Sequence, residues 1–320
     1  MGKPPKSVGE ALLAPSAFTA DLPDSVATAN PLEAAFARLR QREAQQRQLA
    51  ECETALRQKP ASFELLMVAA DLARKLQRNG EAAALYARAL VVRPERGDLA
   101  HLVAALGGGP APARADDTYV VTLFDAAAEK FDETLVGFLN YQVPELVLAA
   151  ARETLGEKAA GQDVIDLGCG TGLCGPLFRP LARRLEGVDL SAGMVAKARM
   201  RRVYDELAVA EIGAWAAAAR RRYTLALAAD VLVYFGDLAT VFGAVAGILG
   251  PGGRFIFTVE ALPSGDWNLG LAGRYAHGDA YVRRVGEASG FEIESCADIV
   301  PRHNDGKPVA GRLYVLRKRD

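Results

Sequence analysis

The chain of 320 residues has few of the side chains that form disulfides or bind metals, and no long apolar run that could cross a membrane. Its cysteines, Cys52, Cys169, Cys174 and Cys296, form neither a CxxC pair nor a zinc-ligand spacing, so we expect free thiols in a reducing compartment and no structural disulfide. No apolar run approaches the ~20 residues of a membrane-spanning helix. The 38 basic residues nearly equal the 39 acidic ones, so no global field favours nucleic acid or a membrane.

The remaining composition is ordinary for a soluble globular protein: 50% hydrophobic and 24% charged residues. The length suggests two domains. Glu10 and Pro15 interrupt anything like a secretory apolar region, and Lys6 stands where a myristoylation pattern has serine or threonine. The cytoplasm is therefore the expected location.

The first part of the chain predicts a flexible tail followed by helices. Residues 1–30 are rich in Pro, Ala and Ser without sustained periodicity. Residues 31–106 carry strong helix formers with apolar residues at spacings of three and four, which predicts helix pairs. Pro60 and Pro94 lie 34 residues apart, each just after a helical stretch, so a repeat of that period is indicated.

The unit of residues 63–96 resembles the tetratricopeptide repeat. The small or apolar repeat positions fall on Leu66, Ala69, Ala70, Ala73, Ala82, Tyr86 and Ala89. The preceding unit, near residues 29–62, departs from the pattern at Phe36 and Gln48, and an unrelated helical hairpin domain is the alternative. Either domain would offer a docking surface for a protein partner or for self-association.

Residues 107–117, GGGPAPARADD, predict a linker, and residues 118–320 predict a second domain. The segment after Tyr119 reads as a helix with Phe124 and Phe131 on one stripe; with Tyr141 these aromatic residues form either a lid or core packing. From Asp163 onwards short apolar runs alternate with Ala-rich helical stretches, which predicts a parallel sheet with helical crossovers.

The stretch DVIDLGCGTGLCG, residues 163–175, is the most informative motif. Asp166 falls near the carboxyl end of a buried strand, and Gly168, Gly170 and Gly172 follow on the loop. Glycine costs backbone entropy, so this cluster indicates that the backbone passes close to a ligand. The next strand ends on Asp189, where a carboxylate can accept hydrogen bonds from both hydroxyls of a ribose.

The spacing of the glycines separates two cofactor classes. A dinucleotide fingerprint, GxGxxG, needs a third glycine where this chain has Leu173. The pattern D-x-G-x-G-x-G instead resembles motif I of the class I S-adenosylmethionine-dependent methyltransferases, and the resemblance extends from about Tyr119 to the C-terminus. VDLSAGMVAKAR, AADVLVYFGDL and LGPGGRFIFTVE are similar to later segments of that family.

The resemblance implies a Rossmann-like, doubly wound α/β sheet with an antiparallel last strand, formed by FEIESC and GRLYVLRKR, after an all-α helical domain. More narrowly, the chain resembles predicted bacterial methyltransferases that carry tetratricopeptide repeats. Its core also looks related to malonyl carrier-protein methyltransferases of the biotin pathway. No acceptor follows from this, beyond a small-molecule or carrier-bound compound.

The resemblance also implies which residues hold S-adenosylmethionine, with S-adenosylhomocysteine as the product. Asp166 and the three loop glycines would line the methionine part, and Asp189 would hold the ribose. Side chains flanking the ribose, the adenine and the methyl group would be Ser191, Met194, Glu211, Ile212, Asp230 and Tyr234.

Catalysis by this class asks chiefly for positioning and water exclusion, because the sulfonium already activates its methyl group, and we expect no metal. His277, in GRYAHGDAY, is the best candidate for a general base because imidazole titrates near neutral pH; a loop role is the alternative. Arg274 would pair with an acceptor carboxylate, and Tyr234 would face the transferred group.

Other motifs are assigned no chemistry. Cys169 and Cys174 flank the glycine loop and are interpreted as packing residues rather than nucleophiles. The basic tracts RRLE, RMRR and RRR, the last at residues 220–222, are interrupted and lack interleaved aromatics, so they predict a solvated surface and no nucleic-acid groove.

Three alternatives remain beside a methyltransferase for small or carrier-bound acceptors. A protein methyltransferase would hold its target with the helical domain. An interaction scaffold would bind the cofactor without turnover. A dinucleotide oxidoreductase is disfavoured by Leu173.

Overall fold

The computed structural model describes residues 31–133, 135, 140–304 and 306–320. The chain divides into two compact units: one runs to Pro112 and includes Gly270–Gly273, and the other comprises Ala113–Leu269 and Arg274–Asp320. The break after Pro112 falls inside the predicted linker of residues 107–117. The predicted tail of residues 1–30 lies outside the described residues.

The described part of the first unit is helical. Its helices are α1 (Pro31–Gln58), α2 (Phe63–Lys75), α3 (Asn79–Val92) and α4 (Gly97–Ala105). Helix α1 runs unbroken for 28 residues, so the unit near residues 29–62, which departs from the repeat pattern in sequence, contributes one helix rather than a pair. After Pro31 this stretch contains neither proline nor glycine, so nothing in it interrupts the hydrogen-bonding ladder.

Helices α2 and α3 pack through the positions that suggested a repeat. Six of those seven side chains are fully buried and Tyr86 is 1% exposed. The Tyr86 hydroxyl donates to the carboxylate of Asp71 across 2.6 Å. Small residues let the two helix backbones approach closely, and any tight helix pair needs them, so the tetratricopeptide assignment stays a prediction.

The second unit is built on one mixed sheet, and the predicted doubly wound fold is confirmed. Among the described residues, nine strands join in this sheet, whose main path runs β3-β2-β1-β4-β5-β11-β8. Its parallel strands are β1 (Gln162–Leu167), β2 (Ala182–Asp189), β3 (Glu206–Val209), β4 (Tyr223–Ala228) and β5 (Leu249–Leu262). Strand β11 (Gly311–Lys318) is antiparallel to β5 and to β8 (Phe291–Ile299), as the sequence predicts.

Three shorter segments extend the sheet or lie beside it. Strand β7 (Tyr275–Gly278) pairs parallel to the end of β5 and antiparallel to β6 (Trp267–Leu269). Strands β9 (His303–Asn304) and β10 (Lys307–Pro308) form a separate two-stranded ladder. No helix in the described part of the chain is long and apolar enough to cross a membrane.

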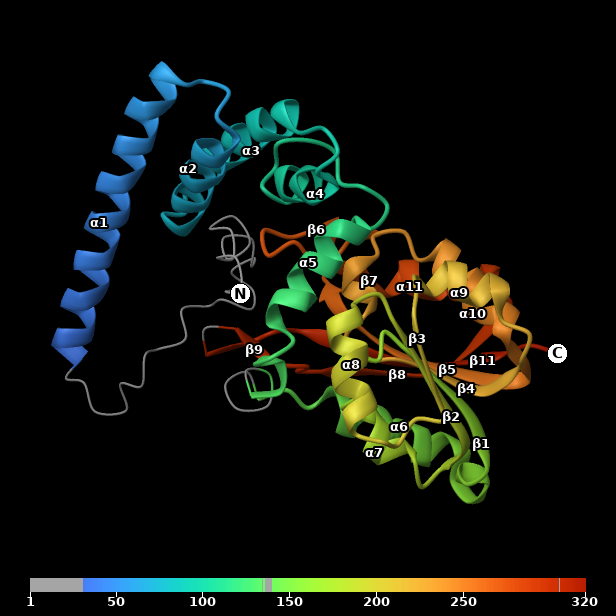
Figure 1. Cartoon of the computed structure of the whole chain (residues 1–320). Helices are drawn as coiled ribbons and strands as arrows, with labels where there is room; N and C mark the ends of the chain where they lie inside the picture. The colour runs from blue at the N-terminus through green and yellow to red at the C-terminus, as the bar shows by residue number, and fades with distance from the viewer. Residues whose placement is uncertain (1–30, 134, 136–139, 305) are drawn as a thin grey trace, which may run out of the picture. The chain divides into compact units, whose positions relative to one another are not determined.

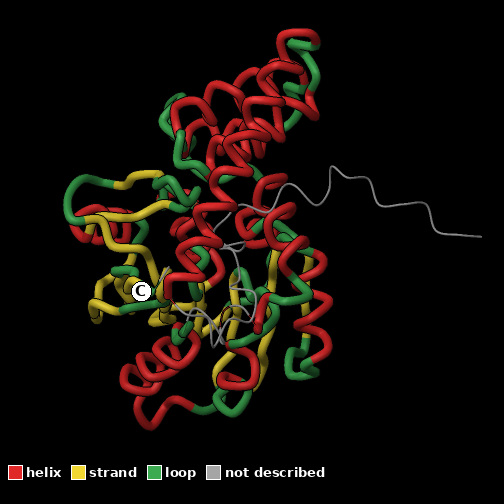
Figure 2. Tube along the Cα trace, turned by 90° about the vertical axis from the view of Figure 1, so that its left-hand side faces the viewer, coloured by secondary structure: helices red, strands yellow, loops and turns green. Residues whose placement is uncertain are grey.

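Helices cover both faces of the sheet (Figure 1). Helices α6 (Val143–Leu155) and α7 (Cys174–Phe178) pack on one face, where Val164 of β1 is buried. Helices α9 (Ile212–Ala218), α10 (Ala239–Ile248) and α11 (Asp279–Ala288) pack on the other, where Ile165 is buried. The strands, yellow in Figure 2, therefore lie between helices and are apolar on both sides.

The remaining helical segments lie around the ends of the strands. They are α5 (Asp117–Ala127), η3 (Gly156–Ala159), α8 (Ala192–Met200) and η4 (Leu232–Tyr234). Because β1 to β4 are parallel, the loops after β1, β2, β3 and β4 all open at the same edge of the sheet. That edge carries the predicted motif residues.

Candidate functional site

The loop after β1 needs glycine for two separate reasons. Gly168, Gly170 and Gly172 have φ angles of 67°, 55° and 82°, in the left-handed region that L side chains rarely adopt. A Cβ on Gly168 would also lie 2.4 Å from a methyl carbon of Val231, so the bare backbone of the loop packs against the Val231 side chain in the segment after β4. Beside Gly170 the Cβ position is open, with no atom within 4 Å.

Asp189, the last residue of β2, is tied to this loop. Its Oδ2 accepts the amide of Gly170 at 2.8 Å, and its Oδ1 accepts the amide of Ser191 at 2.9 Å. Burial raises the pKa of Asp189, and these amides offset part of that effect. Each carboxylate oxygen has a second lone pair, so Asp189 can still accept two hydroxyl hydrogens.

Asp166, near the end of β1, is the second buried carboxylate at this edge. Its Oδ2 accepts the hydroxyl of Tyr204 at 2.7 Å. The pKa of Asp166 is raised to about 7. Burial is the main cause and the charge of Asp189 adds to it, whereas the hydrogen bond from the Tyr204 hydroxyl acts in the opposite direction. Two carboxylates at adjacent strand ends thus favour a ligand that carries hydroxyl or cationic donors.

The N-terminus of α8 is capped and covered. Ser191 is fully buried, accepts the amide of Met194 at 3.0 Å and donates to the carboxylate of Asp125 in α5. Asp125 also accepts the amide of Gly193 at 3.2 Å. Met194 is also fully buried. Ser191 and Met194 therefore support the wall of the site from the protein interior.

The segment after α5 is fastened to the glycine loop by Asp132. Its carboxylate accepts the Thr171 hydroxyl and the guanidinium of Arg201. Phe124 packs edge-on against Phe131, with ring centroids 5.9 Å apart, and against Tyr234, at 5.4 Å. The predicted lid aromatics Phe124 and Phe131 therefore lie beside the segment after β4, whereas Tyr141 packs against the core under α6 and α7.

The predicted adenine-side residues follow β3. Glu211 caps α9 by accepting the amide of Ala214 at 2.8 Å, and Ile212 is buried in the core cluster that includes Val188. Both lie at the same strand edge as Asp189, because β2 and β3 are parallel and in register there. The Glu211 carboxylate is half-buried and keeps acceptor capacity beyond the cap.

Beyond β4 the chain makes a strained turn at Asp230, a non-glycine residue with φ of 59°. Its amide donates to the Thr258 hydroxyl at 2.9 Å. Arg302 places one terminal nitrogen 3.1 Å from both carboxylate oxygens of Asp230, and Arg274 lies 3.4 Å from one of them. Glu260, at the end of β5, pairs with the same two arginines.

These four residues, Asp230, Glu260, Arg274 and Arg302, form a charge quartet with balanced charge. Arg302 is 1% exposed and Arg274 is 7% exposed. Paired opposite charges make such burial tolerable, and removing one member would leave a buried charge uncompensated. The quartet links the ends of β4 and β5 to the segment between β8 and β9.

Tyr234 lies at the end of η4, beside the charge quartet. The guanidinium carbon of Arg274 is 5.8 Å from the centre of its ring. Its hydroxyl is buried and has no hydrogen-bond partner within the residues the structure describes. A buried hydroxyl without a partner is costly, so it is a natural contact for a polar ligand group.

His277 is fully buried in β7, and the structure does not bring it to the site as a free base. Its Nε2 lies 2.8 Å from the carbonyl oxygen of Phe235 and 3.2 Å from that of Gly236, so it donates its proton there. The ring stacks on Tyr281. Burial lowers the pKa of His277 to about 4, so the imidazole is neutral and anchors the turn after Tyr234.

The thiols beside the glycine loop behave as packing groups. Cys169 and Cys174 are both buried and free. Burial raises the pKa of each thiol well above its usual value. Neither is therefore poised as a thiolate nucleophile.

Several residues of this site were missed from the sequence. Arg302 stands in PRHNDGKP, which reads only as a polar loop, and Tyr204 carries no local signal. Glu260 ends an apolar strand with a carboxylate, the same signal that identified Asp166 and Asp189. Asp125 lies in α5 and Asp132 in the segment after it, and their spacing of seven would share one face only if the helix continued.

Comparison with known proteins agrees with this geometry. Residues 138–295 match the protein family described as "Methyltransferase domain". A malonyl-[acyl-carrier protein] O-methyltransferase of Yersinia pestis is 28% identical over 177 residues, which are 53% of this chain and 61% of that protein. This chain thus spans about three fifths of that relative's length. A ubiquinone biosynthesis O-methyltransferase of Ralstonia nicotianae is 28% identical, over 49% of this chain and 71% of that protein.

An aklanonic acid methyltransferase of a Streptomyces species is 27% identical, over 46% of this chain and 67% of that protein. Among solved structures, a 1,6-didemethyltoxoflavin N1-methyltransferase of Burkholderia thailandensis aligns with a TM-score of 0.52 at 18% identity, covering 66% of this chain and 94% of that one. That likeness shows the fold: a Rossmann-like methyltransferase fold whose sheet is mostly parallel and ends in an antiparallel strand, preceded here by a helical region.

Proposed function

We propose that this chain, whose residues 138–295 match the methyltransferase-domain family, transfers a methyl group from S-adenosylmethionine to a small-molecule or carrier-bound acceptor. One observation carries the proposal. The carboxylate of Asp189 accepts a hydrogen bond from the amide of Gly170 at 2.8 Å and keeps acceptor capacity for two ribose hydroxyls. The open space beside Gly170 leaves room for a ligand against the loop backbone.

The residues present fit this cofactor by their chemistry. Asp189 would accept the ribose hydroxyls, and Asp166 with the loop of Gly168, Gly170 and Gly172 would line the methionine part. A cationic ammonium group near Asp166 would favour its carboxylate form and so offset the cost of its burial. Ser191, Met194, Glu211 and Ile212 would form the wall toward the adenosine. When bound, S-adenosylmethionine supplies a methyl group already activated by its sulfonium.

The chain's own contribution is positioning and water exclusion. Phe124 and Phe131 cover the edge of the sheet where β1 and β4 end, and Asp125 and Asp132 hold that cover onto α8 and the glycine loop. The buried Tyr234 hydroxyl would hold the acceptor, with Arg274 beside it. Asp230 would help to hold Arg274, 3.4 Å away, whose guanidinium lies 5.8 Å from the centre of the Tyr234 ring.

The acceptor class is inferred from three supports. The relatives named above act on a malonyl carrier protein, on aklanonic acid and in ubiquinone biosynthesis. The proposed acceptor side combines the Tyr234 hydroxyl, which has no partner among the described residues, with Arg274 and Arg302, and this suits an oxygen-bearing acceptor. A general base at His277 is not favoured by its contacts, so we assign His277 the role of positioning the turn after Tyr234.

The helical unit would serve a partner rather than the chemistry. Phe36 and Leu39 of α1 are 58% and 55% exposed, and their spacing of three puts them on one face. Exposed apolar side chains on one helix face suit a second protein or a second copy of this chain. A protein methyltransferase that recruits its target in this way is the second candidate function.

Calorimetric titration tests the cofactor. S-adenosylmethionine and S-adenosylhomocysteine should bind the wild-type chain, NAD should not, and Asp189→Ala should weaken binding by about tenfold or more, because charge-assisted hydrogen bonds to both hydroxyls are lost. Asp298→Ala is the matched control, since the side chain of Asp298 is 87% exposed. Equal affinity in wild type and Asp189→Ala would refute the site.

A transfer assay separates the acceptor classes. The chain would be incubated with methyl-labelled cofactor and a cell extract fractionated by size. Label in small molecules or on a carrier protein supports the first function. Label on other proteins, lost when Phe36 and Leu39 are changed to serine, supports the second. Cofactor binding with no labelled product supports the scaffold alternative.

A further inference from the structure

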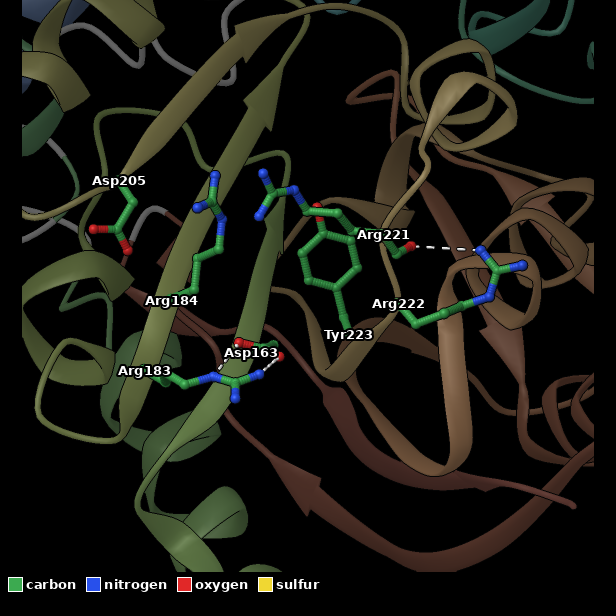
Figure 3. A pocket seen from close by; sticks show the side chains of 7 residues that line it. All are labelled: Asp163, Arg183, Arg184, Asp205, Arg221, Arg222 and Tyr223. Atoms are coloured by element: carbon green, nitrogen blue, oxygen red, sulfur yellow. Dashed lines mark hydrogen bonds and ion pairs between the residues drawn. The ribbon is translucent and has the colours of Figure 1, made fainter.

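A pocket of about 470 Å³ opens at the edge of the sheet opposite the glycine loop (Figure 3). It is lined where β1, β2 and β4 begin, by Asp163, by Arg183 and Arg184, and by Arg221, Arg222 and Tyr223. The glycine loop lies at the other end of these parallel strands. A strand of six residues spans roughly 17–20 Å, so the pocket is separate from the candidate cofactor site.

The fold assembles this pocket from tracts that are distant in the sequence. RRLE supplies Arg183 and Arg184 from the start of β2, and RRR supplies Arg221 and Arg222 from the loop before β4. Each tract alone predicts a solvated surface. Parallel strand starts come together at one edge of the sheet, and so they bring four arginines to the lining of one pocket.

The charges lining the pocket are unequal. Four arginines face two aspartates, Asp163 and Asp205, an excess of two positive charges, whereas the whole chain has a net charge of −1. Asp163 already pairs with Arg183, and Asp205 pairs with Arg179, outside the pocket lining. The aspartates therefore do not neutralise the other guanidinium groups.

Two of the guanidinium groups share a single carboxylate. The Nε atoms of Arg184 and Arg221 both approach Oε1 of Glu186, the latter at 3.9 Å. The other oxygen of Glu186 accepts the Tyr223 hydroxyl at 2.7 Å. Figure 3 shows the guanidinium groups of Arg184 and Arg221 directed to the same side of the Tyr223 ring.

The remaining donors are only partly used. Arg184 gives one terminal nitrogen to Glu206 at 3.0 Å. Arg222 donates to the backbone carbonyl of Arg221 at 3.4 Å, and across the described ranges it pairs with no carboxylate. Arg221 makes no closer ion pair there than its contact with Glu186. Terminal N–H groups of at least two arginines are thus left for an anion.

We propose that this pocket is a phosphate-binding site, in which the guanidinium groups of Arg184 and Arg221 hold a phosphate group beside Tyr223. The planar fork of arginine matches the oxygen geometry of phosphate. Glu186 holds the Arg184 guanidinium directly and lies 3.9 Å from Nε of Arg221, so the two forks lie beside one carboxylate. The phosphate is either inorganic phosphate or the phosphoryl group of a small molecule. This site is independent of methyl transfer.

Calorimetry in low-salt buffer free of phosphate and sulfate tests the proposal with full-length protein. The probes are inorganic phosphate, pyrophosphate and glycerol 3-phosphate. We expect Arg221→Gln to weaken binding by about tenfold or more, since charged hydrogen bonds are lost. Arg221 is more than half exposed, so the variant should fold. S-adenosylhomocysteine binding should not change in this variant.

The matched control is Arg284→Gln, an exposed arginine of α11 that pairs with Asp266 and lines no part of the pocket. It should bind the probes as the wild type does. Stronger binding of glycerol 3-phosphate than of inorganic phosphate would identify the source as an organic phosphate, and equal binding would identify phosphate itself. No binding, equal weakening in both variants, loss of probe binding in Asp189→Ala, or binding of a poly-glutamate peptide but of none of the phosphates would overturn the proposal.

Discussion

Asp189 and Gly170 are joined by a hydrogen bond of 2.8 Å between the Oδ2 of the carboxylate and the amide of the glycine. The bond ties the end of β2 to the loop after β1, so the carboxylate and the loop backbone hold one geometry. Because Gly170 has φ of 55°, another residue in its place would be strained and would move the amide. The cofactor side of the site is therefore set by backbone conformation as much as by side chains.

Gly168→Ala should destabilise the chain by about 2 kcal/mol or more, because the new Cβ meets Val231 at 2.4 Å and the φ of 67° disfavours an L side chain. Urea unfolding measures this. Gly247→Ala is the control: it lies in α10 with no atom within 4 Å of its Cβ, so alanine should be neutral or stabilising by up to about 1 kcal/mol. Adding Val231→Ala to Gly168→Ala should recover part of the loss. Wild-type stability for Gly168→Ala would contradict the close approach.

Asp166→Asn should change how stability depends on pH. The folded pKa of about 7 lies above the ordinary carboxyl value of 3.8, so between these values the folded chain binds more protons than the unfolded one. The contribution of Asp166 is therefore fully present below about pH 4 and lost as pH rises through 7. Asparagine keeps an acceptor for Tyr204 and removes this slope.

The relevant quantity is the free energy of unfolding of the Asp166→Asn variant minus that of the wild type, without ligand. It should increase by about 1–3 kcal/mol between about pH 5 and pH 8. Asp298→Asn, at an exposed carboxylate, should show no such change. A parallel pH dependence in wild type and Asp166→Asn would show that Asp166 ionises normally.

His277→Gln should keep methyl transfer within about tenfold of the wild type, because its amide can still donate to the carbonyls of Phe235 and Gly236. His277→Ala leaves those buried carbonyls unsatisfied and should cost about 1–3 kcal/mol of stability. A general base would behave differently, with losses of about 10²–10⁴ in both variants. Such a loss in His277→Gln, with wild-type stability, would restore the base assignment.

The pH dependence of stability gives a second test of whether His277 is a buried, neutral donor. Its folded pKa of about 4 lies below the ordinary 6.5, so the unfolded chain binds the extra proton between these values. Its contribution to stability is present above about pH 6.5 and is lost as the pH falls toward 4. His277→Gln should remove that acid sensitivity in urea unfolding.

Arg302→Met should destabilise the chain by about 3–5 kcal/mol, because two largely covered carboxylates, Asp230 and Glu260, then share Arg274 alone. Adding Glu260→Gln should recover part of that loss. The control Arg284→Met removes an exposed pair with Asp266 and should cost at most about 1 kcal/mol. Equal losses in the two single variants would mean that the charge quartet contributes no more than a surface ion pair.

The fold followed from local patterns because those patterns have one physical solution. Alternating apolar runs and helical stretches after Asp163 require a parallel sheet with helices on both faces. The antiparallel pairing of β11 with β8 was also expected. Residues 31–58, predicted as helical, form the single helix α1, because continuous helix formers outweigh a weak repeat pattern.

The candidate site also combines features that the sequence indicates with features that only the tertiary structure produces. The sequence by itself determined that Asp166, the loop glycines and Asp189 meet at the ends of neighbouring strands. That they bind the cofactor stays a prediction, based on a strand that ends on a carboxylate before glycines. Only the tertiary structure decided that Arg302 pairs with Asp230, that His277 is buried as a neutral donor, and that Arg184 and Arg221 meet at Glu186. Those outcomes depend on burial and on contacts between distant segments, which no local spacing encodes.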